Sequence, residues 1–194
     1  MKYVSIFISF LLVTGLCEYA SGTPIVGWGN NYSGQISGIP KCDYLQIDAG
    51  VNHGLGLCPD GSLVCWGDNH DNIVNDTPTG NDFSEISAGF VHNVAMKTDG
   101  SLSAWGANDY GQTNVPDITG IKKISAGMFH NLAIASDERI IGWGTNYYGV
   151  LDIPSGIGYR DVAAGGVLSA AINAAGVLEL WGSVIRPDAF PVKN

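Results

Sequence analysis

The chain has 194 residues, of which 45% are hydrophobic and 14% are charged, so it can fold around a core and is not a disordered tail. Its formal net charge is −9, and its nine lysines and arginines are scattered along the sequence. Because nucleic acids are held by clustered basic side chains, this charge argues against a nucleic-acid partner.

The N-terminus has the pattern of a secretory signal peptide, which we place at residues 1–22. Lys2 supplies a positive end, residues 4–15 are almost entirely apolar, and residues 20–22 (Ala-Ser-Gly) offer small side chains for cleavage. The apolar run is short for a transmembrane helix. An uncleaved anchor and a lipoprotein site at Cys17 are the alternatives. The pattern predicts a secreted or periplasmic protein with no membrane attachment after cleavage.

After this segment the sequence repeats itself. Tryptophans recur at separations of 38, 39, 38 and 38 residues, at Trp28, Trp66, Trp105, Trp143 and Trp181. A period of this length is typical of stacked repeat architectures. It predicts a repeat domain at residues 23–182 with four units of 38 to 39 residues, and a C-terminal tail at residues 183–194.

Other residues keep fixed places relative to the tryptophans. A histidine follows the glycine of each Ala-Gly pair by three residues, and a leucine replaces it in the fourth unit: His53, His92, His130 and Leu168. An asparagine stands three residues after each of the first four tryptophans, where its side chain is expected to cap a turn. In the same loops we expect positive φ angles at Gly34, Gly111 and Gly149, and at Asn72 in the remaining copy.

Each unit divides into three short apolar stretches bounded by glycines and turn residues, which favours strands over helices. Asp60-Gly61 and Asp99-Gly100 are dipeptides typical of hairpins. In the second stretch, large side chains alternate with Gly or Ala, which suits sheets stacked closely face to face. The sequence predicts an all-β fold: a β-propeller, or an incomplete propeller, of about four three-stranded antiparallel blades plus one orphan strand at residues 24–28. A β-solenoid is the alternative.

The sequence does not decide whether such a propeller closes into a ring, because the orphan strand lacks the other two strands of its blade. Open sheet edges invite pairing with other chains. Three arrangements are compatible with the sequence. The four blades close by themselves, two copies complete one ring as a homodimer through the open edges, or the chain is a shortened relative of a longer propeller.

Three cysteines follow the predicted signal peptide: Cys42, Cys58 and Cys65. If Asp60-Gly61 forms a two-residue hairpin loop, Cys58 faces Leu63, and Cys65 lies one diagonal step away on the same face. A disulfide between Cys58 and Cys65 and a set of small buried thiols are both compatible with this arrangement. The spacing does not resemble a zinc site.

The pattern WGxNxxGQxxxP, followed by Ile-Ser-Ala-Gly, His-Asn-Leu-Ala-Ile, a turn and a second Trp-Gly, resembles the regulator of chromosome condensation repeat family. It looks closest to the bacterial β-lactamase inhibitory protein type II branch, over residues 25–182. The resemblance implies a propeller of three-stranded blades. It also implies a ring of about seven blades, from which the four units of this chain depart.

An up-down-up strand order brings the Ala-Gly-x-x-His turns and the Trp-Gly loops to one face. That face carries aromatic, apolar and acidic side chains, which are typical of protein interfaces on a rigid scaffold. The candidate partner-binding residues are Tyr32, Phe90, Val91, Asp109, Tyr110, Met128, Phe129, Tyr147 and Tyr148. The inhibitor resemblance implies the same face. The alternative is that some of these side chains fill a central channel or pack between blades.

The tryptophans and histidines of the repeat are expected to be structural. One large flat side chain per unit is typical of packing between blades, at Trp28, Trp66, Trp105, Trp143 and Trp181. We interpret His53, His92 and His130 as imidazoles bonded to neighbouring turns rather than as metal ligands. No catalytic motif, cofactor site or metal site is expected.

Three functions remain. The first is an exported, non-catalytic module that binds an unidentified protein, with an inhibitor of a secreted hydrolase as one version implied by the resemblance. The second is a structural cell-surface repeat or shortened propeller without a site of its own. The third is a propeller enzyme, a lyase or glycosidase, which would need paired carboxylates that converge in the channel.

Overall fold

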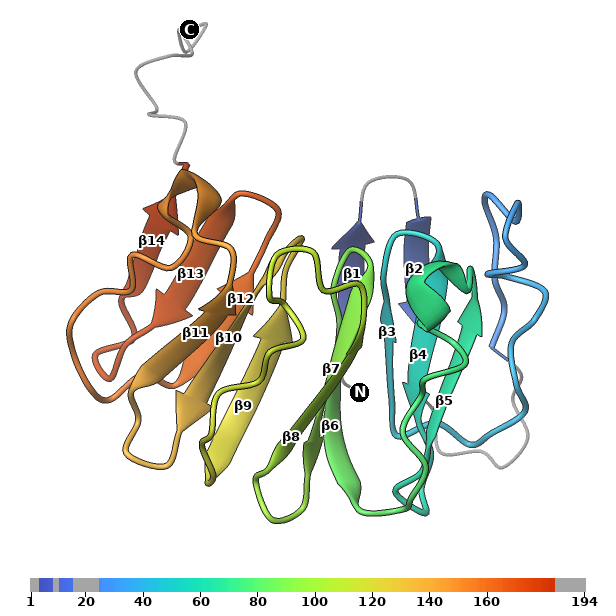
Figure 1. Ribbon diagram of the computed structural model, residues 1–194, viewed down its shortest axis with the longest axis horizontal. Helices are drawn as coiled ribbons and strands as arrows, with labels where there is room; N and C mark the ends of the chain where they lie inside the picture. The colour runs from blue at the N-terminus through green and yellow to red at the C-terminus, as the bar shows by residue number, and fades with distance from the viewer. Residues whose placement is uncertain (1–3, 9–10, 16–24, 184–194) are drawn as a thin grey trace, which may run out of the picture.

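The computed structural model describes residues 4–8, 11–15 and 25–183 (Figure 1). Within these residues the regular structure consists of strands and two short 3₁₀ turns, η1 (His70–Asn72) and η2 (Tyr147–Gly149). The strands of the repeat region form four three-stranded antiparallel sheets, each with its strands in chain order. The predicted all-β fold with four three-stranded blades is therefore confirmed.

The blades take their strands in sequence order. Blade 1 contains β3 (Gln46–Ala49), β4 (His53–Leu57) and β5 (Leu63–Gly67), and blade 2 contains β6 (Phe83–Ala88), β7 (His92–Lys97) and β8 (Leu102–Gly106). Blade 3 contains β9 (Ile121–Ala126), β10 (His130–Ala135) and β11 (Ile140–Gly144), and blade 4 contains β12 (Asp161–Ala164), β13 (Leu168–Ile172) and β14 (Leu178–Gly182).

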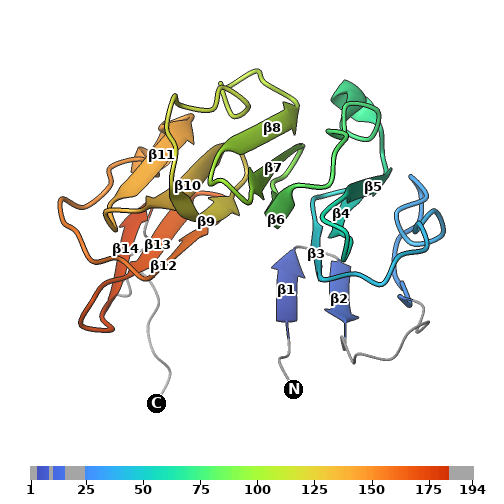
Figure 2. The ribbon, with the colours of Figure 1, turned by 90° about the horizontal axis from the view of Figure 1, so that it is seen from below.

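The four blades stand side by side in chain order and form an open arc (Figures 1 and 2). The first strand of each blade contacts the first strand of the next, so β3, β6, β9 and β12 follow one another along the arc. Blade 4 lies at one end, and residues 25–45 lie beyond blade 1 at the other end. The four blades therefore do not close into a ring by themselves.

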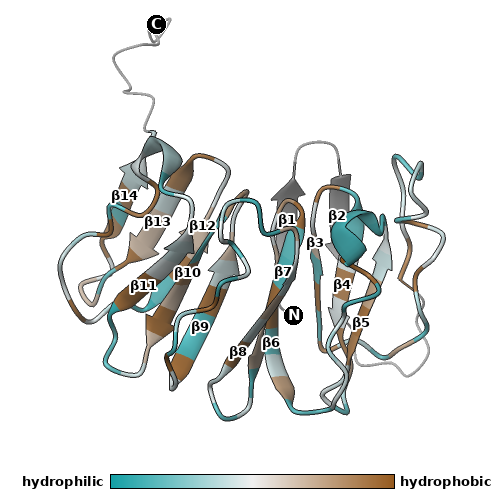
Figure 3. Ribbon diagram, viewed as in Figure 1, coloured by the Kyte–Doolittle hydropathy of each residue, from teal (hydrophilic) through white to brown (hydrophobic). Residues whose placement is uncertain are grey.

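Apolar side chains fill the junctions between consecutive blades. Figure 3 shows the hydrophobic residues of the strands in brown. We call the side of a blade that meets the next blade in the chain its forward face, and the other side its backward face. Leu55 and Leu57 on the forward face of blade 1 cluster with Ile86, Ala95 and Trp105 of blade 2. The other two junctions repeat this pairing, with Val94, Met96, Ala133 and Trp143, and with Leu132, Ile134, Ala171 and Trp181. The predicted alternation of large and small side chains is confirmed.

The N-terminal segment contains two further strands, β1 (Val4–Ile8) and β2 (Leu11–Gly15), which pair as an antiparallel hairpin. The predicted cleavage region at residues 20–22 lies outside the described residues, and signal function stays a prediction. Of the predicted tail, only Ser183 is described. No helix in the described part of the chain is long and apolar enough to cross a membrane.

The predicted orphan strand is not formed: residues 25–28 belong to no strand, and Pro24 lies outside the described residues. A strand is defined by hydrogen bonds to a neighbour, and the first two strands of its blade are missing from this end of the arc. Residues 25–44 instead cover the backward face of blade 1. The Trp66 indole N–H donates to the Gln35 carbonyl at 2.9 Å, and the Tyr44 ring lies 6.0 Å from the Trp66 ring.

The cysteines pair differently from the disulfide considered above, because the hairpin register differs by one residue. Leu57, not Cys58, lies opposite Leu63, while the Cys58 N–H donates to the Ser62 carbonyl within the turn. Side chains alternate across a strand, so Cys58 and Cys65 project from opposite faces. Cys58 forms its disulfide with Cys42, and Cys65 is a free thiol. The disulfide attaches the N-terminal covering segment to blade 1.

Candidate functional site

The turn after the first strand and the loop after the third strand of each blade emerge at the same edge of the arc, which we call the loop face. In every blade a backbone hydrogen bond ties the two together: Asp68 N–H to Asn52 O, Ala107 to Val91, Thr145 to Phe129 and Ser183 to Val167, at 2.8 to 3.0 Å. In Figure 1 this edge, which carries η1 and η2, lies uppermost, and the Asp-Gly hairpins lie at the lower edge.

The Trp-Gly loop of blade 2 shows how the repeated residues shape this face. The Asn108 side-chain oxygen accepts the Thr113 N–H at 3.0 Å, and the Gln112 side-chain oxygen accepts the Tyr110 N–H at 2.9 Å. Gly111 takes a φ of 75°, which completes the turn at a conformation that glycine adopts without strain. These bonds close the loop on itself and leave Tyr110 exposed at its tip.

The other copies of the loop are built the same way. Asparagine side chains accept backbone N–H groups five residues on, in the pairs Asn31 with Ile36, Asn69 with Val74 and Asn146 with Leu151. Positive φ angles occur at Gly34, Gly111, Gly149 and Asn72. Both expectations for this loop, the capping asparagine and the positive φ, are confirmed.

Four of the predicted binding residues form one aromatic cluster that crosses from blade 2 to blade 3. The Phe90 and Phe129 rings lie 5.8 Å apart, the Tyr110 and Phe129 rings lie 4.7 Å apart, and the Tyr110 and Tyr147 rings lie 6.0 Å apart. Such tilted and edge-to-face arrangements are favourable for aromatic pairs. Phe90, Tyr110 and Tyr147 keep exposed ring surface, and Phe129 is half-buried beneath them.

The remaining predicted binding residues lie around or away from this cluster. Asp109 and Tyr148 are exposed on the neighbouring loop tips, and Val91 is half-buried in the turn of blade 2. Met128 is half-buried and reaches toward the turn of blade 4, where its Cε lies 3.8 Å from the position of a β-carbon on Gly166. Tyr32 is fully exposed on the loop before blade 1, apart from the cluster.

An acidic group not predicted as a site borders the cluster on the blade 1 side. The His70 Nδ1 lies 2.8 Å from the Asp71 carboxylate, and Asp71, then Asp68 and Asp109, raise the pKa of this exposed imidazole above its usual value. Next to it, Val51, Asp68, His70 and Phe90 line a small hollow. The sequence offers no signal for this group, because the approach of Asp68 and Asp71 to Asp109 of the next blade is a long-range contact.

The tryptophans from blades 1 to 4 have one shared geometry. Each is buried, and its indole N–H donates to the backbone carbonyl of the loop before it, at 2.8 to 3.0 Å: Trp66 to Gln35, Trp105 to Ile73, Trp143 to Gln112 and Trp181 to Val150. Trp28 differs, since it is 43% exposed. Trp105, Trp143 and Trp181 therefore join blade to blade, and Trp66 joins blade 1 to the segment before it.

The histidines also join consecutive blades, through a side chain of the next blade rather than a neighbouring turn. Nε2 of each lies 2.8 to 2.9 Å from a side-chain oxygen, in the pairs His53 with Asn93, His92 with Asn131 and His130 with Ser169. Burial lowers the pKa of all three, to about 4 for His92 and His130. They are neutral at physiological pH, and no group of three metal-ligating side chains occurs in the described residues.

A second set of bonds links the first strands. A side-chain oxygen accepts the backbone N–H of the alanine in the next blade, in the pairs Asp48 with Ala88, Ser87 with Ala126 and Ser125 with Ala164, at 2.9 to 3.0 Å. The Ala49 N–H of blade 1 is satisfied within its own blade, by the Asp48 carboxylate at 2.8 Å. Burial raises the pKa of Asp48, which is engaged in structure rather than in chemistry.

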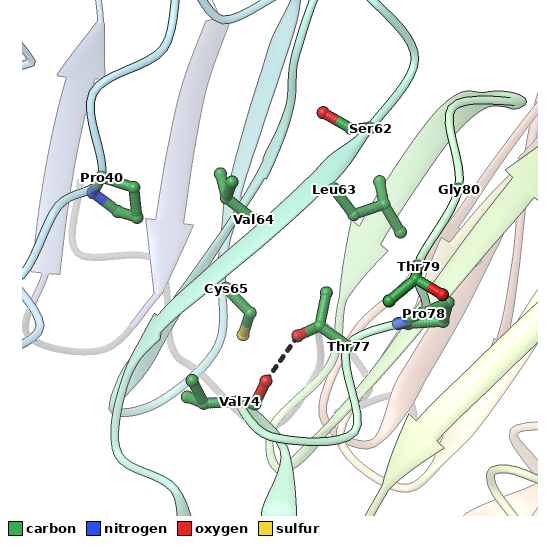
Figure 4. Close-up of a pocket in the computed structure, with 10 residues that line it drawn as sticks. All are labelled: Pro40, Ser62, Leu63, Val64, Cys65, Val74, Thr77, Pro78, Thr79 and Gly80. Carbon is green, nitrogen blue, oxygen red and sulfur yellow. Dashed lines mark hydrogen bonds between the residues drawn. The ribbon is translucent and has the colours of Figure 1, made fainter.

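A cavity lies at the outer rim of blade 1, away from the aromatic cluster. It has a volume of about 420 Å³ and lies between β5 and the connection to blade 2, with Pro40, Leu63, Cys65, Val74 and Pro78 among its lining residues (Figure 4). Burial raises the pKa of the Cys65 thiol to about 11, so it is protonated and a poor nucleophile. The lining contains no carboxylate or histidine for acid–base chemistry.

These features define an open arc of β-propeller blades with an aromatic loop face. Three segments, residues 45–73, 83–112 and 121–150, match the family model of the regulator of chromosome condensation (RCC1) repeat. The predicted repeat family is thereby confirmed for these three units. The unmatched fourth unit is the one in which Leu168 replaces the histidine. A search among curated proteins finds no match to the chain.

Several solved structures share the fold, and the chain matches about half of the length of each of the three named here. The ectodomain of the Physcomitrella patens receptor kinase CR4 has a TM-score of 0.73 at 22% identity, over 89% of this chain and 47% of that one. Human WBSCR16 has a TM-score of 0.68 at 17% identity, over 80% and 55%. Prp20p from Saccharomyces cerevisiae, which binds Gsp1p and histones, has a TM-score of 0.62 at 20% identity, over 80% of this chain and 48% of that one. The chain thus spans about half the length of these relatives, and the likeness establishes the fold.

Proposed function

We propose that the chain is a non-catalytic protein-binding module that acts outside the cytoplasm and grips its partner with the loop face. The observation that carries this proposal is the aromatic cluster of Phe90, Tyr110, Phe129 and Tyr147, which leaves ring surface exposed on two adjacent blades. Aromatic side chains held on a rigid scaffold dominate the binding energy of protein interfaces. They contribute contact area at little cost in side-chain entropy.

The charge around the cluster indicates the chemistry of the partner. Asp68 and His70 line a hollow together with Phe90. Asp71 and Asp109 lie close enough to His70 to raise its pKa, and the chain carries a net charge of −9. An acidic border around an apolar centre favours a partner patch that is apolar in the middle and carries lysine or arginine at its edge. A secreted hydrolase with such a patch at its active-site rim is the version that the resemblance to the bacterial inhibitor branch supports.

A capture experiment tests this function. The chain is immobilised and exposed to the extracellular fraction of the source organism, in parallel with a Phe90→Ala/Tyr110→Ala variant and an Ile157→Ala control. Ile157 is an exposed apolar residue at the far end of the connection from blade 3 to blade 4, where the Tyr159 N–H donates to the Glu138 carbonyl of the hairpin at the opposite edge. We expect one specific protein to bind to the wild type and to the control but not to the double variant. Equal capture by all three chains, or no specific capture, contradicts the proposal.

An inhibitory version of the function has its own measurement. The captured protein is assayed for hydrolytic activity with and without the wild-type chain, and loss of activity in a stoichiometric complex supports inhibition. Binding without loss of activity would support the protein-binding function and contradict the inhibitory version of it. Loss of binding through unfolding is distinguished by thermal unfolding of the double variant, which we expect to change little because both rings are partly exposed.

A further inference from the structure

The two ends of the arc carry the two unmatched halves of a blade junction. Among the described residues no blade packs on the forward face of blade 4, and its apolar side chains are open to solvent. Leu178 is 59% exposed and Leu180 is 47% exposed on β14. The equivalent forward-face positions of blades 1 to 3 are buried or half-buried, as at Leu63 and Ile140. A patch of core-type side chains left open in this way marks an interaction surface.

At the other end of the arc, residues 25–28 carry the side chains of the opposite half of a blade junction. Val26 and Trp28 occupy the places that Val64 and Trp66 hold on the backward face of blade 1, one repeat period earlier. In blades 1 to 4 this tryptophan is buried against the preceding unit. Val26 is 68% exposed and Trp28 is 43% exposed, because no unit precedes them in the described chain.

The polar residues of blade 4 fit an occupant with only this one strand segment. In blades 1 to 3 a histidine binds the second strand of the next blade, and an Asp or Ser binds the alanine N–H of its first strand. Blade 4 has Leu168 and Ala163 at these two places. The segment at residues 25–28 has neither a first nor a second strand. It therefore lacks the groups that a histidine at position 168 and an Asp or Ser at position 163 would bind. What remains on blade 4 is the apolar surface on which a tryptophan packs.

We propose that two copies of this chain associate head to tail, with Val26 and Trp28 of one copy packed on Leu178 and Leu180 of the other. The two ends lie at opposite extremes of the open arc, so they cannot meet within one molecule (Figures 1 and 2). Head-to-tail contacts that close make a ring. A two-copy ring contains two identical junctions, and the second forms as an intramolecular event once the first is made.

The mass of the purified full chain in solution, measured by light scattering at micromolar concentrations, tests the association. We expect twice the mass of one chain. Trp28→Ala removes one half of the junction, and Leu178→Asp with Leu180→Asp removes the other. Each should weaken association by about 30-fold or more, since a central aromatic anchor carries much of the binding energy. Ile157→Asp, which also places a charge at an exposed apolar site, should leave the mass unchanged.

Mixing the variants distinguishes head-to-tail contact from contact between two blade 4 faces. A Trp28→Ala chain keeps an intact blade 4 face, and a Leu178→Asp/Leu180→Asp chain keeps an intact Trp28 end, so an equimolar mixture should recover a two-chain species that neither forms alone. A Trp28→Ala chain that still pairs with itself overturns the proposal. So does a wild-type chain that stays single at all concentrations. Circular dichroism of each variant checks that the blades stay folded, which we expect because the altered side chains are exposed.

The proposal is independent of the loop-face function. If the wild-type chain forms the two-chain species but captures no partner, the proposed binding function is refuted and the proposed association is supported. If the chain stays monomeric but captures a partner through Phe90 and Tyr110, the association is refuted and the binding function is supported.

Discussion

Nε2 of His92 in blade 2 lies 2.8 Å from Oδ1 of Asn131 in blade 3, and neither side chain is exposed to solvent. The Asn131 amide donates to the Gln112 carbonyl at 2.8 Å, which orients its oxygen toward the histidine. His92 must then donate through Nε2, and its Nδ1 has no partner in the described structure. The pair therefore ties two blades together through a neutral imidazole.

A double-mutant cycle on His92 and Asn131 measures the free energy of their interaction. We expect His92→Leu and Asn131→Ala each to lower the free energy of unfolding, and the double variant to lose less than the sum of the two. The coupling should be about 1 kcal/mol, the usual worth of a buried neutral hydrogen bond. Urea unfolding of the four proteins gives the value. Strict additivity would show that the contact contributes no stability.

Acid should destabilise the fold through the same histidines. Burial lowers the pKa of His92 and of His130 from 6.5 to about 4. The unfolded chain then binds more protons than the folded chain between these values, so stability is full above pH 6.5 and falls as the pH drops toward 4. Each histidine contributes on the order of 3 kcal/mol over this window. Asp48 and Glu85, whose pKa values are raised by burial, oppose this trend.

Urea midpoints at neutral pH and near the acid end of the window check this expectation. His130→Leu, which copies the residue of the fourth unit, serves as the comparison, because removing one titrating group should make the pH dependence shallower. A His130→Leu chain with the same acid sensitivity as the wild type would assign the effect to other groups.

The glycine of each Ala-Gly pair should be irreplaceable where a histidine follows. A β-carbon on Gly89 would overlap the His92 ring and lie 2.7 Å from the Gly127 carbonyl oxygen. Gly89→Ala should push His92 away from Asn131 and cost about 2 to 3 kcal/mol. Gly166→Ala is the matched control, because its nearest neighbour is the Met128 Cε at 3.8 Å. Thermal unfolding should separate the two variants clearly, and equal behaviour would contradict the close-approach explanation.

The Cys42–Cys58 disulfide should stabilise the first blade together with the segment that covers it. It closes a loop with a sequence separation of 16, for which a loss of chain entropy in the unfolded state predicts about 3 kcal/mol. We expect Cys42→Ser/Cys58→Ser to lower the thermal midpoint, and reductant to do the same to the wild type. Cys65→Ala is the control for the free thiol. Reductant should lower its thermal midpoint by as much as it lowers that of the wild type. A reductant-insensitive wild type would be at odds with this pairing.

Local and periodic features were the ones that the sequence could predict. The spacing of Trp66, Trp105 and Trp143 gave the unit, because every blade needs the same strand end. The positive φ angles at Gly34, Gly111 and Gly149 could be predicted because only a few residues adopt that conformation without strain. Alternation of large and small side chains predicted that the sheets stack closely face to face.

Features that depend on distant or subtle geometry were missed. The Cys42–Cys58 pairing follows from a one-residue difference in the register of a hairpin, which no pattern in the turn Pro59–Ser62 reveals. The residues at 24–28 read as a strand because they copy the third strand of a unit, but a strand needs partners. That Asp68 and Asp109 would flank one imidazole depended on the contact between neighbouring loops.

Asp48 accepts the Ala49 N–H, so this N–H of blade 1 needs no side chain from a preceding blade, while Leu168 and Ala163 of blade 4 stand where the other blades carry polar links. From blade 1 to blade 4 every junction uses the same two kinds of link: a histidine that meets a side-chain oxygen, and a side-chain oxygen that accepts an alanine N–H. An internal unit could therefore be duplicated or deleted by recombination at its period, and each new junction would inherit matched donors and acceptors. The array can change its length in evolution, or by design, without any adjustment of its two terminal units.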